Sequence, residues 1–206
     1  MELRILTATD IRAALSMRAA IDAVGQAFGQ FSAGTAEVPL RTRLHTEKGV
    51  TLLMPAYLRD GGQLAVKIVS VYGDNPSQGL PTVAALVQVL DSRTGMPRAL
   101  LEGDTLTALR TGAAGGLAAD LLARADAERV ALFGAGVQSR SQLEAILAVR
   151  QVNHVDLIDL NLQAAERLAG EIAAWPDAPA VSVVTDVQAA VRQADIVVAA
   201  TTSRSP

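Results

Sequence analysis

Residues 130–146 read VALFGAGVQSRSQLEAI, and this run carries the strongest signal for the fold of the chain. The apolar run Arg129–Phe133 predicts a short strand, and Gln138–Val149 predicts a helix that follows it almost at once. Gly134 and Gly136 stand in the turn between the two. Glycines in this context permit a tight turn and let a pyrophosphate approach the helix N-terminus. The turn therefore predicts a dinucleotide site, and the alternative is a βαβ turn with incidental glycines.

The same alternation continues to the end of the sequence. Strands are predicted at His154–Leu160, Ala180–Thr185 and Ala194–Ala199, and helices at Leu162–Trp175 and Val187–Arg192. Strands that alternate with helices indicate a parallel sheet built from βαβ units. The pattern of predicted secondary structure changes near residue 125, so we expect one domain at 1–125 and an incomplete Rossmann-type domain at 126–206.

Three further positions bear on the predicted nucleotide site. Asp159 ends the second strand, 23 residues after Gly136, where a carboxylate can accept both ribose hydroxyls of adenosine. It would repel a 2′-phosphate, which favours NAD over NADP; the alternative is a helix-capping aspartate. Thr201 and Thr202 would emerge at the carboxyl edge of the sheet and either contact the cofactor or form a polar loop.

The first 125 residues follow another pattern. A helix is predicted over residues 7–33, capped by Thr7 or Thr9 and broken near Ser16, and a second over Thr105–Ala123. Between them, antiparallel strands are predicted at Val50–Pro55, Gln63–Tyr72 and Thr82–Asp91. The fold class is therefore α/β, with an N-terminal α+β domain of antiparallel strands before the parallel sheet.

Composition excludes several classes of protein. Half of the 206 residues are hydrophobic and 19% are charged, which is enough apolar material for a core. With no cysteine and two distant histidines, no metal site is expected, and a net charge of −3 without a basic block argues against nucleic acid as a partner. No stretch suits a signal peptide or a membrane span, so we expect a cytoplasmic protein.

Basic residues mark a second candidate site. The sequence holds two lysines, and one of them, Lys67, lies in the apolar run LAVKIVSV. Lysine there is costly unless its ammonium finds a partner, although it could also point to solvent. Arg41, Arg43 and Arg110 are candidates to join it, since three cations suit a substrate carboxylate; Arg41 or Arg43 could instead be an ordinary strand-edge charge, and Arg110 a helix-surface charge.

Several motifs in order resemble one family. The runs MPAY, VKIVSVYGDNPSQGLPTVAALVQVL, DTLTALRTGAAGG, VALFGAGVQSR and ATTSR resemble the ornithine cyclodeaminase/mu-crystallin family over essentially the whole chain. The wording of GLPTVAAL and RTGAAGG resembles the archaeal-type alanine dehydrogenase branch. The resemblance implies a homodimer that pairs a β-rich dimerisation and substrate domain with a Rossmann domain.

The resemblance also implies roles by position. Lys67 would be catalytic and would hold the substrate carboxylate together with Arg41 and Arg110. The implied cofactor-binding residues are Thr82, Arg110, Thr111, Gly134, Gly136, Val137, Gln138, Asp159, Thr201 and Thr202.

Two departures from the family qualify these implications. Ornithine cyclodeaminases carry a glutamate two residues before the MP pair, where it handles the side-chain amine of ornithine; Leu52 stands there in this chain. Family members also continue past ATTSR and supply a catalytic aspartate, so we expect this sequence to be truncated and the chain alone to be inactive if nothing follows it.

Three functions remain open at this point. The first is an NAD-dependent oxidoreductase for a small amino or imino acid, of the alanine dehydrogenase or ketimine/pyrroline-carboxylate reductase type. The second is a cyclodeaminase for ornithine or another diamino acid, which Leu52 disfavours. The third is a fragment that binds cofactor or ligand without catalysis.

Overall fold

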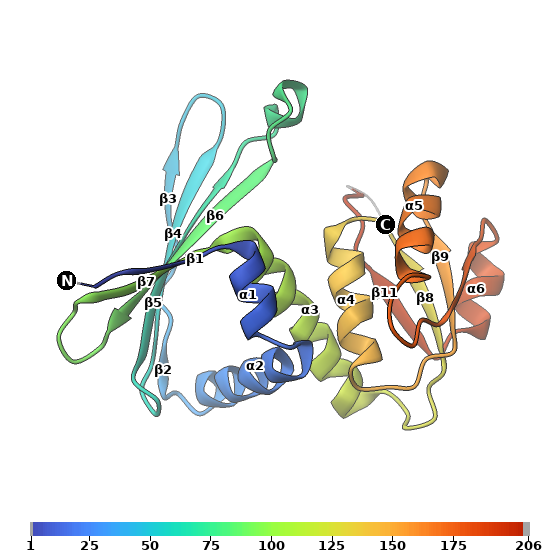
Figure 1. Cartoon of the computed structure of the whole chain (residues 1–206), viewed down its shortest axis with the longest axis horizontal. Helices are drawn as coiled ribbons and strands as arrows, with labels where there is room; N and C mark the ends of the chain where they lie inside the picture. Colours follow the sequence, from blue (N-terminus) through green and yellow to red (C-terminus); the bar gives the residue numbers. More distant parts are fainter. Residues whose placement is uncertain (1, 204–206) are drawn as a thin grey trace. The chain divides into compact units, whose positions relative to one another are not determined.

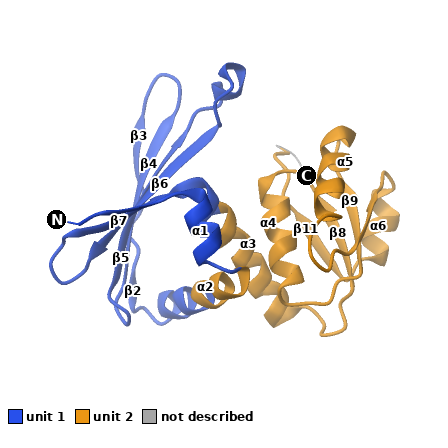
Figure 2. Ribbon diagram, viewed as in Figure 1, with its two compact units in different colours: residues 1–16, 25–107 blue, residues 17–24, 108–206 orange. Residues whose placement is uncertain are grey.

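The computed structural model describes residues 2–203, so the last part of the predicted Rossmann-type domain, residues 204–206, lies outside the described residues. Packing divides the chain into two compact units, 1–16 with 25–107 and 17–24 with 108–206 (Figure 2). This division falls inside a helix, earlier than the change of pattern at residue 125. The boundary between domains at 125 and 126 stays a prediction.

The first unit contains a mainly antiparallel sheet. Its described strands run in the order β1-β7-β6-β5-β4-β2, with β3 paired to β4 (Figure 1). The parallel pair is β1 with β7. The strands are β1 (Arg4–Leu6), β2 (Ala36–Glu37), β3 (Thr42–His45), β4 (Val50–Leu58), β5 (Gln63–Val71), β6 (Val83–Asp91) and β7 (Pro97–Glu102).

Three helices accompany this sheet in the sequence. They are α1 (Ala8–Ala14), α2 (Met17–Ser32) and α3 (Gly103–Leu122), and a short 3-10 helix η1 (Asn75–Gln78) precedes β6. Thr7 caps α1 in a capping box with Asp10, which confirms the predicted start. The predicted break near Ser16 is confirmed as well, because α1 ends and α2 begins on either side of it.

The second unit contains a parallel sheet in the order β10-β9-β8-β11. Its strands are β8 (Arg129–Phe133), β9 (His154–Ile158), β10 (Ala180–Val183) and β11 (Ile196–Ala199), and its helices are α4 (Val137–Leu147), α5 (Leu162–Ile172) and α6 (Val187–Gln193). The predicted Rossmann-type sheet is confirmed. Because β9 and β11 flank β8 on opposite sides, the strand order reverses beside β8, which is where such sheets bind ligands.

The core of the second unit is apolar and closely packed. Val130, Leu132, Val155 and Leu157 from the two central strands are fully buried and pack with Leu143, Ile146, Leu168 and Ile172 from α4 and α5. Gly112 of α3 lies against α4, where an added Cβ would stand 2.3 Å from the Ser141 carbonyl oxygen. No helix within residues 2–203 combines the length and apolar content needed to cross a membrane.

Candidate functional site

The turn after β8 lies at the point where the strand order of the parallel sheet reverses. A pocket of about 560 Å³ opens there, lined by residues that follow β8, β9 and β11. We call it the switch-point pocket; its lining residues are Gly134, Ala135, Gly136, Asp159, Leu160, Asn161, Ala164, Ala200, Thr201, Thr202 and Ser203. The structure thus brings together five residues that the sequence predicts for cofactor binding, namely Gly134, Gly136, Asp159, Thr201 and Thr202.

Gly134 is required by the backbone of this turn. Its φ is +101°, a region that residues with a Cβ rarely adopt. A Cβ at this position would also stand 2.7 Å from the carbonyl oxygen of Ala200 and 3.0 Å from Oγ of Ser139. Ser139 is fully buried, so its small size lets α4 lie close to β8, as the motif predicts.

Gly136 has a different role at the start of α4. It is the N-cap residue, it makes no side-chain capping hydrogen bond, and a Cβ placed on it would meet no atom within 4 Å. The N–H groups of the first turn of α4, beginning at Val137 and Gln138, therefore receive no capping hydrogen bond from the N-cap side chain. Such an end favours an anion, because its N–H groups and the helix dipole both attract negative charge.

Asp159 connects the turn to the end of β9. One carboxylate oxygen accepts from the Ala135 N–H at 2.7 Å, and the other accepts from the Asn161 N–H at 2.7 Å. The capping alternative is wrong, because Asn161 caps α5 by accepting from the Ala164 N–H at 3.1 Å. Asp159 is half-buried at the pocket wall.

Lys67 lies on the second strand of the central hairpin in the first unit. It is half-buried, and its Nζ donates to Oγ1 of Thr107 at 2.5 Å. Its strand neighbours in register are Met54 of β4 and Val87 of β6. Leu52 pairs with Val69, so it lies on the same sheet face as Lys67, as alternation along β4 and β5 requires.

Two acidic residues, Glu102 and Asp104, lie where β7 meets α3, and Asp104 interacts electrostatically with Lys67. Partial burial and the Glu102 carboxylate raise the pKa of Asp104 above its usual value, against the opposing effects of the Ala85 N–H and Lys67. Glu102 accepts from the N–H groups of Asp104 and Thr105 at 2.6 and 3.0 Å. Although burial opposes its ionisation, these bonds and the Thr105 hydroxyl hold the pKa of Glu102 below its usual value.

The remaining candidate residues are dispersed over the chain. Arg41 is exposed in the segment before β3, and Thr82 is exposed just before β6, where its carbonyl accepts from the Tyr72 N–H at 2.9 Å. Arg110 is exposed on α3, and the carbonyl of Thr111 accepts from Nε2 of Gln142 at 3.2 Å. Arg110 and Thr111 belong to the second unit, so their grouping with Lys67, Arg41 and Thr82 stays a prediction.

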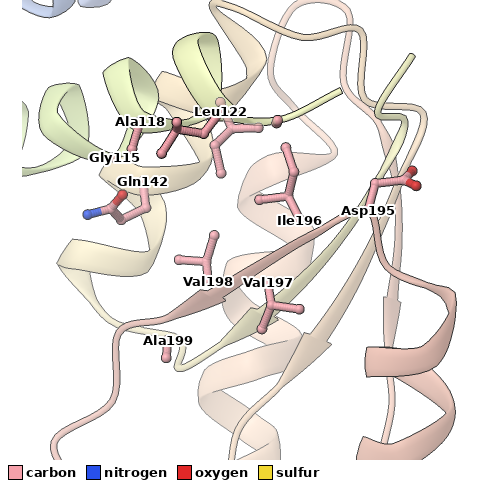
Figure 3. A pocket seen from close by; sticks show the side chains of 12 residues that line it. Gly115, Ala118, Leu122, Gln142, Asp195, Ile196, Val197, Val198 and Ala199 are labelled. Atoms are coloured by element: carbon pink, nitrogen blue, oxygen red, sulfur yellow. The ribbon is translucent and has the colours of Figure 1, made fainter. Parts of the chain in front are cut away.

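A second pocket, of about 440 Å³, lies along β11 in the second unit (Figure 3). Figure 3 shows Ile196, Val197 and Val198 of β11 beside α3 and α4. Its two polar side chains are engaged: Gln142 donates to Thr111, and Asp195 accepts from the N–H groups of Glu128 and Arg129. The pocket is therefore mostly apolar and offers little to a polar reaction.

Comparison with known proteins places this arrangement in one family. The family model described as ornithine cyclodeaminase/mu-crystallin matches residues 1–206. The chain belongs to the ornithine cyclodeaminase/mu-crystallin family. It is 35% identical over 206 residues to an alanine dehydrogenase of Archaeoglobus fulgidus. The match covers 100% of this chain and 62% of that relative.

Two solved structures of the family are similar in fold. One is a Thermococcus litoralis Delta(1)-pyrroline-2-carboxylate reductase in complex with NADH and L-proline, at 40% identity and a TM-score of 0.91, covering 98% of this chain and 63% of that one. The other is an archaeal alanine dehydrogenase dimer with bound NAD, at 36% identity and a TM-score of 0.91, covering 100% and 62%. This chain thus spans slightly less than two thirds of the relatives' length.

Sequence reasoning missed Thr107. The residue lies in the run DTLTALRT, one helical turn before Arg110, and that spacing on a predicted helix was the available signal. It also missed Ala135, which contacts Asp159 through its backbone N–H. A backbone contact of this kind leaves no trace in residue type.

Proposed function

We propose that this chain is the substrate and NAD-binding portion of an NAD-dependent oxidoreductase for a small amino or imino acid. The supporting observation is the switch-point pocket, in which Gly134, Gly136 and Asp159 meet beside an α4 N-terminus that has no side-chain cap. The reaction class rests on the similarity to an alanine dehydrogenase and to a pyrroline-2-carboxylate reductase.

The residues of the pocket fit the cofactor part by part. Gly136 and the first N–H groups of α4 would hold the pyrophosphate, with Val137 and Gln138 lining the turn. Asp159 would accept from the adenosine ribose, and its charge would exclude the 2′-phosphate of NADP. Thr201 and Thr202 would lie beside the cofactor, as would Thr82, Arg110 and Thr111. When bound, NAD supplies or accepts the hydride.

The basic residues would bind and orient the substrate. Arg41 and Arg110 carry permanent charges suited to a carboxylate, and Lys67 adds a third cation. Arg110 follows Thr107 by one turn of α3, so both project from the same side of that helix. Lys67 would also move a proton to or from the nitrogen of the substrate, a role for which an amine is suited and a guanidinium is not.

A cyclodeaminase is the second candidate, and Leu52 argues against it. Leu52 stands where the resemblance expects a glutamate, and it lies on the sheet face that carries Lys67, diagonal to it across β4 and β5. Leucine offers no partner to the side-chain ammonium of ornithine. The charged end of a diamino acid would therefore lose the ion pair that the family's cyclodeaminases provide.

A homodimer through the first sheet is part of the proposal. By register, Ile5, Leu44, Ile68 and Leu86 lie on the face opposite Lys67, and they are 71, 56, 37 and 40% exposed. An apolar face of this extent is typical of an interface between subunits.

A substrate panel tests the reaction class. The chain, or the longer product if its gene encodes residues beyond 206, is assayed with NADH against pyruvate plus ammonia and against a cyclic imino acid. It is assayed separately with ornithine for ammonia release. We expect NADH oxidation with at least one imine and little ammonia from ornithine. Release of ammonia and proline from ornithine without a net change in NADH would favour the cyclodeaminase. NADH binding without turnover of any substrate would favour a fragment that binds cofactor without catalysis.

A further inference from the structure

The hydroxyl of Thr107 has a fixed orientation at the start of α3. It donates to the carbonyl oxygen of Gly103, one turn earlier, at 2.5 Å. Because a threonine hydroxyl has a single hydrogen, its oxygen can only accept from Lys67, whose Nζ lies 2.5 Å away. The contact therefore holds the amine of Lys67 as a donor in one place.

Apolar side chains lie next to Lys67 in the sheet. Met54 and Val87 flank it in register on β4 and β6, and neither side chain accepts a strong hydrogen bond. A half-buried amine on such a face is costly unless a polar atom satisfies it. Thr107 supplies such an atom from the start of α3.

The start of α3 is itself held firmly against the sheet. A Cβ at Gly103 would stand 2.4 Å from the Ala85 carbonyl carbon, so the helix backbone lies directly on β6. The Glu102 carboxylate accepts from the N–H groups of Asp104 and Thr105 and so fixes the first turn. Both anchors lie within five residues of Thr107, which makes its hydroxyl a rigid support for Lys67.

We propose that Thr107 is a positioning residue that sets where the Lys67 amine stands for proton transfer. The inference rests on the proposed function, because Lys67 needs a fixed position only if it serves a reaction. A displacement of the amine by about an ångström greatly lowers the rate of proton transfer, since transfer depends on the geometry between the amine and the substrate nitrogen.

The charge of Asp104 is the competing explanation. Asp104 interacts electrostatically with Lys67 and lies on the same first turn of α3. If attraction to this carboxylate holds the amine, Asp104→Asn will release Lys67 and Thr107→Val will not. If the hydroxyl holds it, the reverse applies.

The lysine content of the chain allows a direct readout that does not need activity. Lys48 and Lys67 are the two lysines, and Lys48 is exposed. Brief acylation by a limiting amine reagent, followed by mass spectrometry of the peptides, gives the reactivity of Lys67 relative to Lys48 within one sample. Wild type is compared with Thr107→Val, Thr107→Ser and Asp104→Asn.

We expect the Lys67 to Lys48 ratio to rise about tenfold in Thr107→Val and to stay within about twofold of wild type in Thr107→Ser. Asp104→Asn should leave the ratio within about twofold. In the turnover assay, Thr107→Val should lower kcat about tenfold with little change in KM for NADH, and Thr107→Ser should restore it. Thr107→Ala replaces the valine variant if thermal unfolding shows that valine prevents folding.

Each outcome decides one of the two claims. Equal labelling ratios in wild type, Thr107→Val and Thr107→Ser overturn the positioning role, as does a raised ratio in Asp104→Asn alone. A ratio that rises in valine and not in serine supports the contact. If wild type then turns over none of the imines, the contact stands and the proposed function fails.

Discussion

The N–H of Ala135 lies 2.7 Å from a carboxylate oxygen of Asp159, so the glycine turn after β8 is joined to the end of β9. The second oxygen of Asp159 accepts from the Asn161 N–H at 2.7 Å. The two hydrogen bonds thereby fix the carboxylate at the wall of the switch-point pocket. Under the proposed function, this fixed carboxylate would accept from the adenosine ribose of NAD and disfavour the 2′-phosphate of NADP.

Replacing Asp159 by serine should weaken NADH binding and reduce the preference of the protein for NADH over NADPH. The variant loses a charged acceptor for the ribose and the charge that repels a 2′-phosphate, so we expect at least a tenfold higher Kd for NADH. Fluorescence titration with each nucleotide measures both effects. Asp177→Asn is the matched control, because Asp177 has a φ of +53° that asparagine tolerates and lies outside the pocket. Unchanged NADH affinity in Asp159→Ser would contradict the assignment.

The two glycines of the turn should respond differently to alanine. Gly134→Ala forces a Cβ to within 2.7 Å of the Ala200 carbonyl oxygen at a φ of +101°, and we expect a loss of about 1 to 3 kcal/mol in the free energy of unfolding. Gly136→Ala has open space and a φ of −98°, so its stability should change by less than about 0.5 kcal/mol.

NADH affinity should complement the stability measurements on Gly134→Ala and Gly136→Ala. The methyl group of Gly136→Ala would stand where the pyrophosphate approaches, so this stable variant should bind NADH at least tenfold more weakly. Urea unfolding and NADH titration of both variants give the comparison. A Gly136→Ala protein with wild-type affinity would remove the turn from the cofactor site.

Asp195 should make stability depend on pH. Its carboxylate accepts from the N–H groups of Glu128 and Arg129, both at 3.0 Å, and it pairs with Arg124. The two backbone N–H groups lower the pKa of Asp195 below its usual value of 3.8, with a further contribution from Arg124. A lowered pKa means that the folded state favours the carboxylate. The stabilisation is therefore complete above the unfolded pKa and is lost as pH falls through the folded pKa.

Thermal or urea unfolding of Asp195→Asn tests this dependence. At pH 7 the variant should be less stable by about 1 to 2 kcal/mol, since it loses charge-assisted hydrogen bonds. The difference from wild type should shrink as the pH falls below 3.8. A difference that stays constant down to pH 2 would show that charge on Asp195 contributes nothing.

The open face of the first sheet should control assembly. Ile68→Glu and Leu86→Glu each place a charge on adjacent strands of that face, and we expect the dimer to dissociate in light-scattering measurements at micromolar concentration. Leu121→Glu is the control, because Leu121 is 73% exposed on α3 in the other unit. Dimers that survive both sheet substitutions would place the interface elsewhere.

Much of the second unit was predictable because its signals are local. The four strands and three helices were predicted within a few residues, since buried parallel strands are continuous apolar runs between polar turns. In the first unit, β4, β5 and β6 were predicted, whereas β1, β2, β3 and β7 were not. β1, β2 and β3 are two to four residues long, which is too short for a clear pattern, and β1 forms by pairing with the distant strand β7.

The candidate site was predictable only where residue type carries the chemistry. Gly134, Gly136 and Asp159 were predicted because their roles need those residue types at that spacing. The link between Lys67 and Thr107 spans 40 residues and depends on how α3 lies over β5, which no local pattern encodes. The contact of Ala135 with Asp159 uses a backbone N–H that every residue except proline has.

Transfer of deuterium from NADH to the product is the direct test of hydride transfer assisted by Lys67. NADH carrying deuterium at both C4 positions is supplied with pyruvate plus ammonia or with a cyclic imino acid, and the amino acid product is analysed by mass spectrometry for wild type and Lys67→Met. We predict one deuterium on the α-carbon of the wild-type product and at least a hundredfold less product from Lys67→Met, with NADH binding unchanged. Product without deuterium, or equal turnover by Lys67→Met, would contradict hydride transfer assisted by Lys67.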